Sequence, residues 1–245
     1  MMQLLHNLLR IVARHQEAQV VAGGAIADHA DVKRLEDAKD LFADAAGFRQ
    51  LIANQGDQRQ IFFHFHAAQR RELGQQRLGQ QVAARIPSGS TLFLDAGSTL
   101  LAVAAQLKGP LTVITASLDI AQLFSDRADI QLILLGGQWD SKQRLFAGSA
   151  TLSLVTRYRA DIAILGACAL HAGLGLSASQ EADADVKRAM LAASAEHWLV
   201  ADHTKLNRCE PWRVAGLSDI HHLFLDRPWA ELGDDPALSV HIADA

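Results

Sequence analysis

Short apolar stretches recur after residue 90, and each is followed by small, hydroxylated or charged residues. The first, Thr91–Leu94, runs into Asp95-Ala96-Gly97-Ser98-Thr99 and then into a helical pattern from Leu100. Strand character is found at 91–94, 111–115, 130–135, 162–165, 197–201 and 222–225, and helical periodicity at 67–86, 100–107, 117–124 and 181–195. Short buried strands that alternate with helices predict an α/β fold, in which a Rossmann-like parallel sheet is covered on both faces.

The residues that follow the predicted strands are the candidate functional residues, because ligands of open parallel sheets bind outside the carboxyl ends of the strands. These ends are Asp95–Thr99, Thr115–Ser117, Gly136-Gly137, Gly166-Ala167 and Asp202–Lys205. Gly97 allows close backbone approach, and the hydroxyls beside it add donors at a helix start, as an anion requires. Taken alone, this turn also fits an ordinary capped strand-to-helix connection. Together, the strand ends predict a pocket for a polar anionic metabolite.

The first 70 residues differ in character from the rest of the chain. Helical periodicity occurs at 4–12 and 31–53, and residues 61–66 alternate weakly as a strand would. We therefore expect a smaller, mainly helical region over 1–70 and a larger domain over 71–245. His64 and His66 have no cysteine or acidic residue close to them in the sequence, so no metal site is expected, and no other cofactor is indicated.

Composition excludes several classes of protein. The net charge of -4 argues against a chain that is basic throughout, although a local basic patch can be masked by an acidic domain. The two cysteines, Cys168 and Cys209, form no CxxC pair, which favours ordinary thiols over a disulfide framework or a zinc site. No run approaches the ~18 apolar residues of a membrane span. We expect a soluble cytoplasmic protein without a membrane partner.

Six motifs of the larger domain occur in an order that resembles a known family. They are Phe93-Leu94-Asp95-Ala96-Gly97-Ser98-Thr99, Val113-Ile114-Thr115-Ala116-Ser117, Leu134-Leu135-Gly136-Gly137, Ala160-Asp161-Ile162-Ala163-Ile164-Leu165-Gly166-Ala167, Asp185-Val186-Lys187-Arg188-Ala189-Met190 and Val200-Ala201-Asp202-His203-Thr204-Lys205. The segment from about Glu72 to Leu232 is similar to the effector domain of DeoR/GlpR-type bacterial transcriptional regulators, which shares its fold with ribose-5-phosphate isomerase and the CoA-transferase group. The resemblance implies a non-enzymatic repressor of sugar-metabolism genes that senses a phosphorylated sugar, binds operator DNA and forms a homo-oligomer.

The resemblance also implies an effector site. Its residues are Asp95, Gly97, Ser98, Thr99, Thr115, Ser117, Gly136, Gly137, Gly166, Lys187, Asp202 and Lys205. The family's phosphate loop corresponds to Asp95–Thr99, whose amides and hydroxyls would hold the phosphate. Lys205 would neutralise the phosphate or meet a ring oxygen, and Asp95 and Asp202 would accept bonds from sugar hydroxyls. For Lys187, an ion pair with Asp183 four residues earlier is an equally good interpretation.

Two departures from the family pattern bear on these expectations. Ala116 stands where the family commonly has Asn, and Cys168 where it often has Asp, so the sugar specificity is expected to differ. The winged helix-turn-helix expected at the amino end is not recognisable. Val32-Lys33-Arg34-Leu35-Glu36 is the nearest basic helical stretch, and acidic residues follow it. Residues 1–70 are therefore a diverged DNA-binding domain, a replaced one, or a segment read in a shifted frame.

Two other functions fit parts of the same pattern. A sugar-phosphate isomerase needs a carboxylate base and an electrophile, and Asp95, Glu181 and Asp202 with Lys187 or Lys205 could provide them. The domain could also serve only in oligomerisation, through the apolar side chains Leu217, Leu223, Phe224 and Trp229 of its carboxyl-terminal segment. A segment that packs onto its own domain would explain these four residues equally well.

Overall fold

A computed structural model of the chain describes residues 73–233 and 236–243. These residues belong to one compact unit, Glu72–Ala245. The helices expected at 4–12 and 31–53, the strand expected at 61–66 and the proposed region 1–70 lie outside the described residues. In the described part of the chain, no helix is both long and apolar enough to span a membrane.

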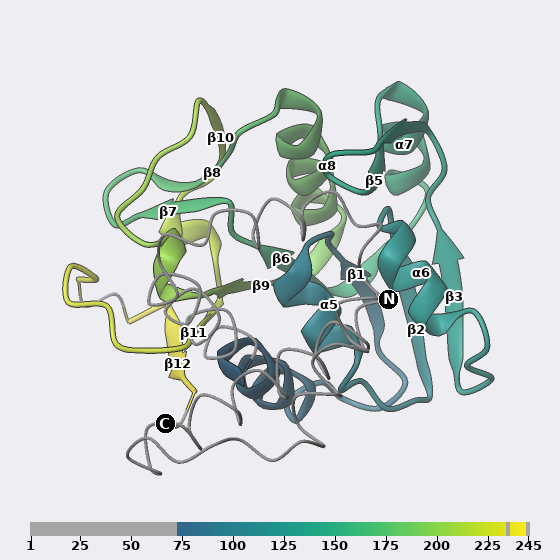
Figure 1. Cartoon of the computed structure of the whole chain (residues 1–245), viewed down its shortest axis with the longest axis horizontal. Coiled ribbons are helices and arrows are strands. Elements are labelled where there is room, and N and C mark those ends of the chain that lie inside the picture. Colours follow the sequence, from purple (N-terminus) through teal and green to yellow (C-terminus); the bar gives the residue numbers. More distant parts are fainter. Residues whose placement is uncertain (1–72, 234–235, 244–245) are drawn as a thin grey trace, which may run out of the picture. The chain divides into compact units, whose positions relative to one another are not determined.

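A seven-stranded parallel sheet forms the centre of the described domain, in the order β12-β11-β9-β6-β1-β2-β3 (Figure 1). Its strands are β1 (Thr91–Leu94), β2 (Leu111–Thr115), β3 (Ile130–Leu134), β6 (Ala160–Gly166), β9 (Ser194–Ala201), β11 (His222–Leu225) and β12 (Ser239–Ile242). Every neighbouring pair in this sheet runs parallel. The α/β class expected from the alternation of strands and helices is confirmed.

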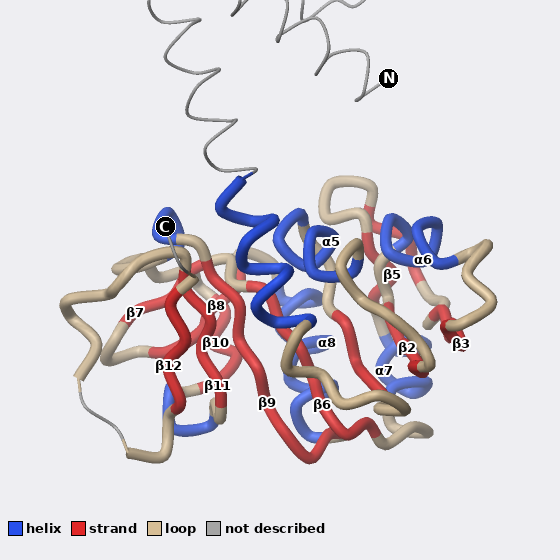
Figure 2. The backbone as a smooth tube through the Cα atoms, turned by 90° about the horizontal axis from the view of Figure 1, so that it is seen from below, coloured by secondary structure: helices blue, strands red, loops and turns tan. Residues whose placement is uncertain are grey.

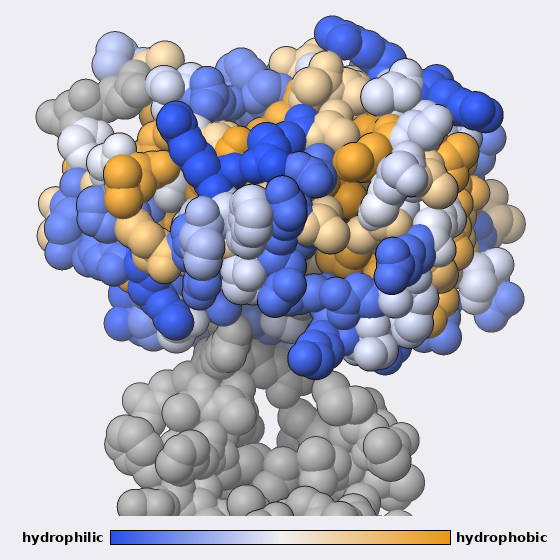
Figure 3. Space-filling model, turned by 90° about the horizontal axis from the view of Figure 1, so that it is seen from above, coloured by the Kyte–Doolittle hydropathy of each residue, from blue (hydrophilic) through white to orange (hydrophobic). Residues whose placement is uncertain are grey.

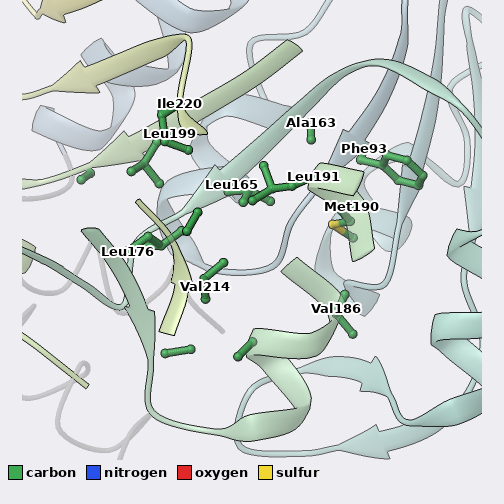
Figure 4. Close-up of a cluster of buried hydrophobic side chains, with 14 of the residues drawn as sticks. Phe93, Ala163, Leu165, Leu176, Val186, Met190, Leu191, Leu199, Val214 and Ile220 are labelled. Atoms are coloured by element: carbon green, nitrogen blue, oxygen red, sulfur yellow. The ribbon is translucent and has the colours of Figure 1, made fainter. Parts of the chain in front are cut away.

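Helices cover both faces of this sheet (Figure 2). A helix over residues 73–83, α5 (Ser98–Ala104) and α6 (Leu118–Phe124) pack on one face, and α7 (Ser149–Val155) and α8 (Glu181–Ala192) on the other. Successive strand residues point to opposite faces. Leu92 and Leu94 therefore join the core under α5, whereas Phe93 joins the core under α8, where Figure 4 shows it near Met190.

Two small antiparallel sheets extend the central one. β4 (Gln138–Asp140) and β5 (Leu145–Ala147) form a hairpin, and the order β10-β8-β7 unites β7 (Ala169–His171), β8 (Gly175–Ala178) and β10 (Trp212–Ala215). The hairpin is joined to the end of β2, because the Phe146 amide donates to the Ala116 carbonyl at 2.8 Å. The strands β4, β5, β7, β8 and β10 and the helix α7 were not expected from the sequence.

Several element boundaries differ from the expected ones for local reasons. The helix expected at 181–195 ends at Ala192, because Ser194 already begins β9, and the helix expected at 67–86 ends at 83, shortly before Pro87. Two short 3-10 helices, His203–Lys205 and Leu217–Asp219, were not expected.

The carboxyl-terminal segment also corrects the sequence analysis. β12 pairs beyond β11, the last strand expected from the sequence, and extends the sheet by a strand that was not expected. Leu223 and Phe224 are fully buried and Trp229 is 7% exposed, so these side chains pack onto their own domain. They do not form an exposed interface between subunits.

Candidate functional site

The point at which the sheet reverses its winding lies between β1 and β6. From β1 the chain proceeds through α5 and α6 to β2 and β3 on one side, whereas from β6 it proceeds through α8 to β9, β11 and β12 on the other. In open α/β sheets, ligands bind at this topological switch point, outside the carboxyl ends of the strands. Asp95 follows β1 there, and β6 ends at Gly166.

A buried cluster of charges lies at the switch point. The Lys187 ammonium of α8 donates to Asp95 Oδ2 and to Asp183 Oδ1, each at 2.7 Å. The Gly166 amide donates to the same Asp95 oxygen at 3.0 Å, across the β1–β6 boundary. The three charged side chains are at most 4% exposed. The cluster therefore fixes the end of β1 to β6 and to α8.

Local sequence explains why these three side chains meet. Asp183 and Lys187 are four residues apart, so both lie on the inner face of α8 beside Val186 and Met190. Asp95 continues the alternation of β1 and points to the same side of the sheet as Phe93. Lys187 thus makes the expected ion pair with Asp183 and also pairs with Asp95 at the strand end, whereas its contact with an effector stays a prediction.

The cluster carries one positive and two negative charges in a buried place, and this composition governs its protonation. Burial disfavours the Lys187 ammonium, but the two neighbouring carboxylates outweigh burial and raise the pKa of Lys187. Burial raises the pKa of Asp95 above its ordinary value, although Lys187 opposes the shift. Burial also raises the pKa of the Cys168 thiol, whose Sγ is 3.6 Å from Asp183 Oδ2. Cys168 is therefore a protonated, poorly nucleophilic thiol at neutral pH.

The turn after Asp95 has the backbone conformation that its glycine predicts. Gly97 has φ of +121°, a region that residues with a side chain rarely adopt, and it precedes the first turn of α5. Gln75 Nε2, from the helix over residues 73–83, donates to Ser98 Oγ at 3.1 Å and to Thr99 Oγ1 at 3.2 Å. A hydroxyl that accepts one bond still has its own proton to donate, so this arrangement leaves two donors for an anion.

The hydroxyl of Thr115 holds the ends of β1 and β2 together. It donates to the Leu94 carbonyl at 2.7 Å and accepts from the Ser117 amide at 3.0 Å, and the side chain is fully buried. Ser117 in turn caps α6 by accepting from the Ile120 amide. Both side chains shape the strand end, and a direct contact of either with a ligand stays a prediction.

Replacement of Thr115 by valine is expected to lower the free energy of unfolding by about 1–3 kcal/mol, because two buried bonds are lost at constant volume. Thr112→Val on the same strand is the control, since Thr112 is only half-buried; a change within about 0.5 kcal/mol is expected there. Urea unfolding of both variants makes the comparison. Equal losses would show that the Thr115 hydroxyl does not hold the strand ends.

Of the two glycines after β3, Gly137 is required by close packing, whereas a Cβ at Gly136 would meet no atom within 4 Å. A side chain at Gly137, where φ is +149°, would place its Cβ 2.0 Å from Thr151 Oγ1 and 2.7 Å from the Ala147 carbonyl oxygen. Thr151 also donates to the Gly136 carbonyl at 2.8 Å. Gly137 therefore allows the β4–β5 hairpin and α7 to pack closely after the end of β3.

Asp202 and Lys205 lie two strands away from β1, at the end of β9. Asp202 is 3% exposed, and its Oδ1 accepts from the Thr204 amide at 2.9 Å, which caps the 3-10 helix His203–Lys205. Lys205 is half-buried at the end of that helix. The family resemblance did not reveal this capping role, although Asp followed by Thr two residues later is a common local signal for it.

The sheet order brings the predicted strand ends to one edge, where their spatial order is Asp202, Gly166, Asp95, Thr115, Gly136. The outer two of these five strands, β9 and β3, are four strand spacings of about 4.8 Å apart, or roughly 19 Å. One small sugar phosphate is shorter than that span. A single ligand centred on the switch point would therefore contact the β1 turn and its neighbours, and not all twelve predicted residues at once. Sequence reasoning missed Gln75 and Thr151, whose partners are distant in the sequence.

A doubly wound sheet with glycine and hydroxyl groups at its switch point defines an α/β ligand-binding domain. The family described as "DeoR C terminal sensor domain" matches residues 71–227, and the chain belongs to this family. Over 154 residues the chain is 34% identical to the glycerol-3-phosphate regulon repressor of Haemophilus influenzae, covering 62% of this chain and 60% of that protein. The Escherichia coli repressor of the same name is 32% identical, with 62% of each chain covered.

A third relative is the HTH-type transcriptional repressor GlcR of Bacillus subtilis, at 32% identity over 62% of this chain and 58% of that protein. The matches thus span about three fifths of the length of these relatives. Among solved structures, ribose 5-phosphate isomerase A of Methanocaldococcus jannaschii is similar at 16% identity, covering 55% of this chain and 54% of that one, with a TM-score of 0.41. A similarity of this size carries no argument about the ligand.

Proposed function

We propose that this protein is a DeoR-type transcriptional repressor of sugar-metabolism genes, and that its C-terminal domain binds a phosphorylated sugar. The observation that supports the proposal most directly is the turn at the switch point, where the Gly97 backbone and the Ser98 and Thr99 hydroxyls stand at the start of α5. The three relatives are named as repressors, and two of those names refer to glycerol 3-phosphate. Operator DNA bound through residues 1–70, a homo-oligomer and a cytoplasmic location complete the proposal.

The helix over residues 73–83 is the part of the domain through which effector binding would reach the DNA-binding region. It directly follows residue 72 in the chain, and Gln75 on its first turn touches both hydroxyls of the proposed phosphate turn. A ligand shifts an equilibrium only if it interacts differently with the two states. Phosphate bound at Ser98 and Thr99 would change the bonds that Gln75 makes, and this provides such a difference.

An isomerase on the same fold is less well supported. A catalytic base must reach the substrate proton, whereas Asp95 Oδ2 accepts from both the Lys187 ammonium and the Gly166 amide. The Lys187 ammonium is shared by two carboxylates, which does not favour its use as an electrophile.

Binding measurements test the proposal. Glycerol 3-phosphate, ribose 5-phosphate, glucose 6-phosphate and fructose 6-phosphate would be titrated into the full chain by calorimetry, with inorganic phosphate and the unphosphorylated sugars as controls. At least one phosphate ester is expected to bind more tightly than its unphosphorylated counterpart and than phosphate alone. If none of the esters binds above the controls, the proposed function is wrong.

Gly97→Ala is expected to weaken binding of the selected ester by about tenfold or more, because a side chain strains the phosphate turn. Gly89→Ala is the matched control. Gly89 also has a positive φ, of +85°, and an open surrounding for a Cβ, but it precedes β1 at the opposite end of the strand. The same calorimetric titration is used for both variants. Equal affinities would show that the turn at Gly97 does not hold the phosphate.

A further inference from the structure

A cavity of about 440 Å³ opens between the β4–β5 hairpin and the first residues of α7 and α8. Its lining includes Gln138, Trp139, Asp140, Gln143 and Gln180. Gln138 directly follows the diglycine after β3, so the cavity begins just beyond the end of that strand. Its volume lies within the range of about 300–1,000 Å³ that is usual for sites of small molecules.

Trp139 gives the cavity an aromatic wall that the structure holds in place. The indole is 38% exposed and forms part of the cavity lining. Phe146 packs against it with ring centroids 5.2 Å apart, and the Arg144 guanidinium lies 6.0 Å from its centroid. Arg144 is itself fixed by Asp119, to which its Nε donates at 2.7 Å. The ring is therefore oriented before any ligand arrives.

The polar groups of the lining are the amides of three glutamines, the Ser141 hydroxyl, the Lys142 ammonium and the Asp140 carboxylate. The Gln180 side chain is exposed and makes no capping bond to α8, although it stands at the N-cap of that helix. Asp140 Oδ1 accepts from the backbone amides of Lys142 at 2.8 Å and Gln143 at 3.0 Å, which orients the carboxylate. An amide offers both donors and acceptors, and adjacent sugar hydroxyls need both.

The charges of the lining argue against the phosphate as the group that enters this cavity. Asp140 and Lys142 balance each other in the lining, and Glu181, which is not part of the lining, adds a negative charge between the lining residues Gln180 and Ala182. The face that carries α7, α8 and the hairpin combines hydrophilic and hydrophobic residues (Figure 3). Neutral hydrogen-bonding groups beside an exposed aromatic ring suit the polar edge and apolar face of a cyclic sugar.

We propose that this cavity binds the ring of a cyclic sugar, with one face of the ring stacked on Trp139 and its hydroxyls bonded to Gln143, Gln180 and Asp140. This inference rests on the proposed function, and it adds a site for the sugar that the phosphate turn does not provide. It also predicts a preference for cyclic sugar phosphates over acyclic ones such as glycerol 3-phosphate, which has no ring face to stack.

Calorimetric titration of glucose 6-phosphate, fructose 6-phosphate and glycerol 3-phosphate into the full chain tests the site. Trp139→Ala is expected to weaken binding of a cyclic sugar phosphate about tenfold, the effect of losing roughly 50 Å² of apolar contact. Trp139→Phe retains a flat ring and is expected to lose no more than about threefold. Trp212→Ala is the matched control, because Trp212 is also 38% exposed but lies on β10, outside the cavity lining. It is expected to bind as the wild type does.

The outcomes separate this inference from the proposed function. If the wild type binds cyclic esters and Trp139→Ala binds them equally well, the sugar site is wrong while the proposed function stands. The same conclusion follows if only glycerol 3-phosphate binds. If no ester binds the wild type, the proposed function fails and this site fails with it. Should Trp139→Ala not fold, the comparison of Trp139→Phe with Gln180→Ala decides: the inference requires a loss with Gln180→Ala and little with Trp139→Phe.

Discussion

Lys187→Met is expected to lower the free energy of unfolding by about 3–5 kcal/mol, because it removes one member of a buried, hydrogen-bonded charge cluster. The methionine side chain nearly fills the same volume, so a cavity contributes little. What remains is a pair of carboxylates, Asp95 and Asp183, that are at most 4% exposed and have lost their shared ammonium. Urea or guanidinium unfolding of the full chain measures the loss.

Arg188→Met is the matched control for Lys187→Met. Arg188 lies next to Lys187 on α8 and pairs with Asp185 three residues earlier, but both side chains of that pair are well exposed. Exposed ion pairs contribute about 0–1 kcal/mol, so the control is expected to lose no more than that. Similar losses in the two variants would show that the buried cluster does not support the fold.

The loss caused by Lys187→Met is also expected to depend on pH. Without the ammonium, burial and the charge of Asp183 raise the pKa of the Asp95 carboxyl above its value in the unfolded chain. At pH values between the pKa of this carboxyl in the unfolded chain and its higher pKa in the folded chain, the folded variant binds more protons than the unfolded one. The free energy of unfolding of the variant therefore falls as the pH rises through that window. Acidification from neutral pH toward about pH 4–5 is therefore expected to recover part of the loss.

Gln75→Ala is expected to abolish the effect of effector binding on the helix over residues 73–83. In the wild type, the tightest-binding phosphate ester is expected to change hydrogen exchange of the amides of this helix by about 5–150-fold, the usual range of coupling between two sites. In the variant, the ratio of the exchange rates without and with the ester is expected to be close to one. The reason is that Gln75 makes the bonds to Ser98 and Thr99 that connect the helix to the phosphate turn. Hydrogen–deuterium exchange with and without the ester measures the effect.

Gln76→Ala is the control for this experiment, since Gln76 is the next residue of the same helix and is exposed. Calorimetry of the same ester shows separately whether Gln75→Ala still binds it. If the variant binds the ester and the exchange of residues 73–83 still responds as in the wild type, the coupling does not run through Gln75. The binding function itself would stand in that case, because the two measurements are independent.

The strand spans were the most predictable part of the fold. The apolar runs at 91–94, 111–115 and 222–225 became strands with these same limits, since each run is short, β-rich and bounded by turn residues. The antiparallel strands β4 and β7 could not be predicted in this way. Each has three residues and depends on a partner strand for its stability, so the local pattern carries no signal for it.

The sequence by itself determined six strands of the central sheet, the polar residues that follow them and the glycine at position 97, because each is encoded by residues adjacent in the chain. Only the tertiary structure decided that Lys187 also joins Asp95, that Gln75 touches the phosphate turn and that Trp139 walls a cavity. These contacts bring together residues that are distant in the sequence. Their positions follow from the insertion of β6 beside β1, which depends on the packing of the whole sheet and not on any local run of residues.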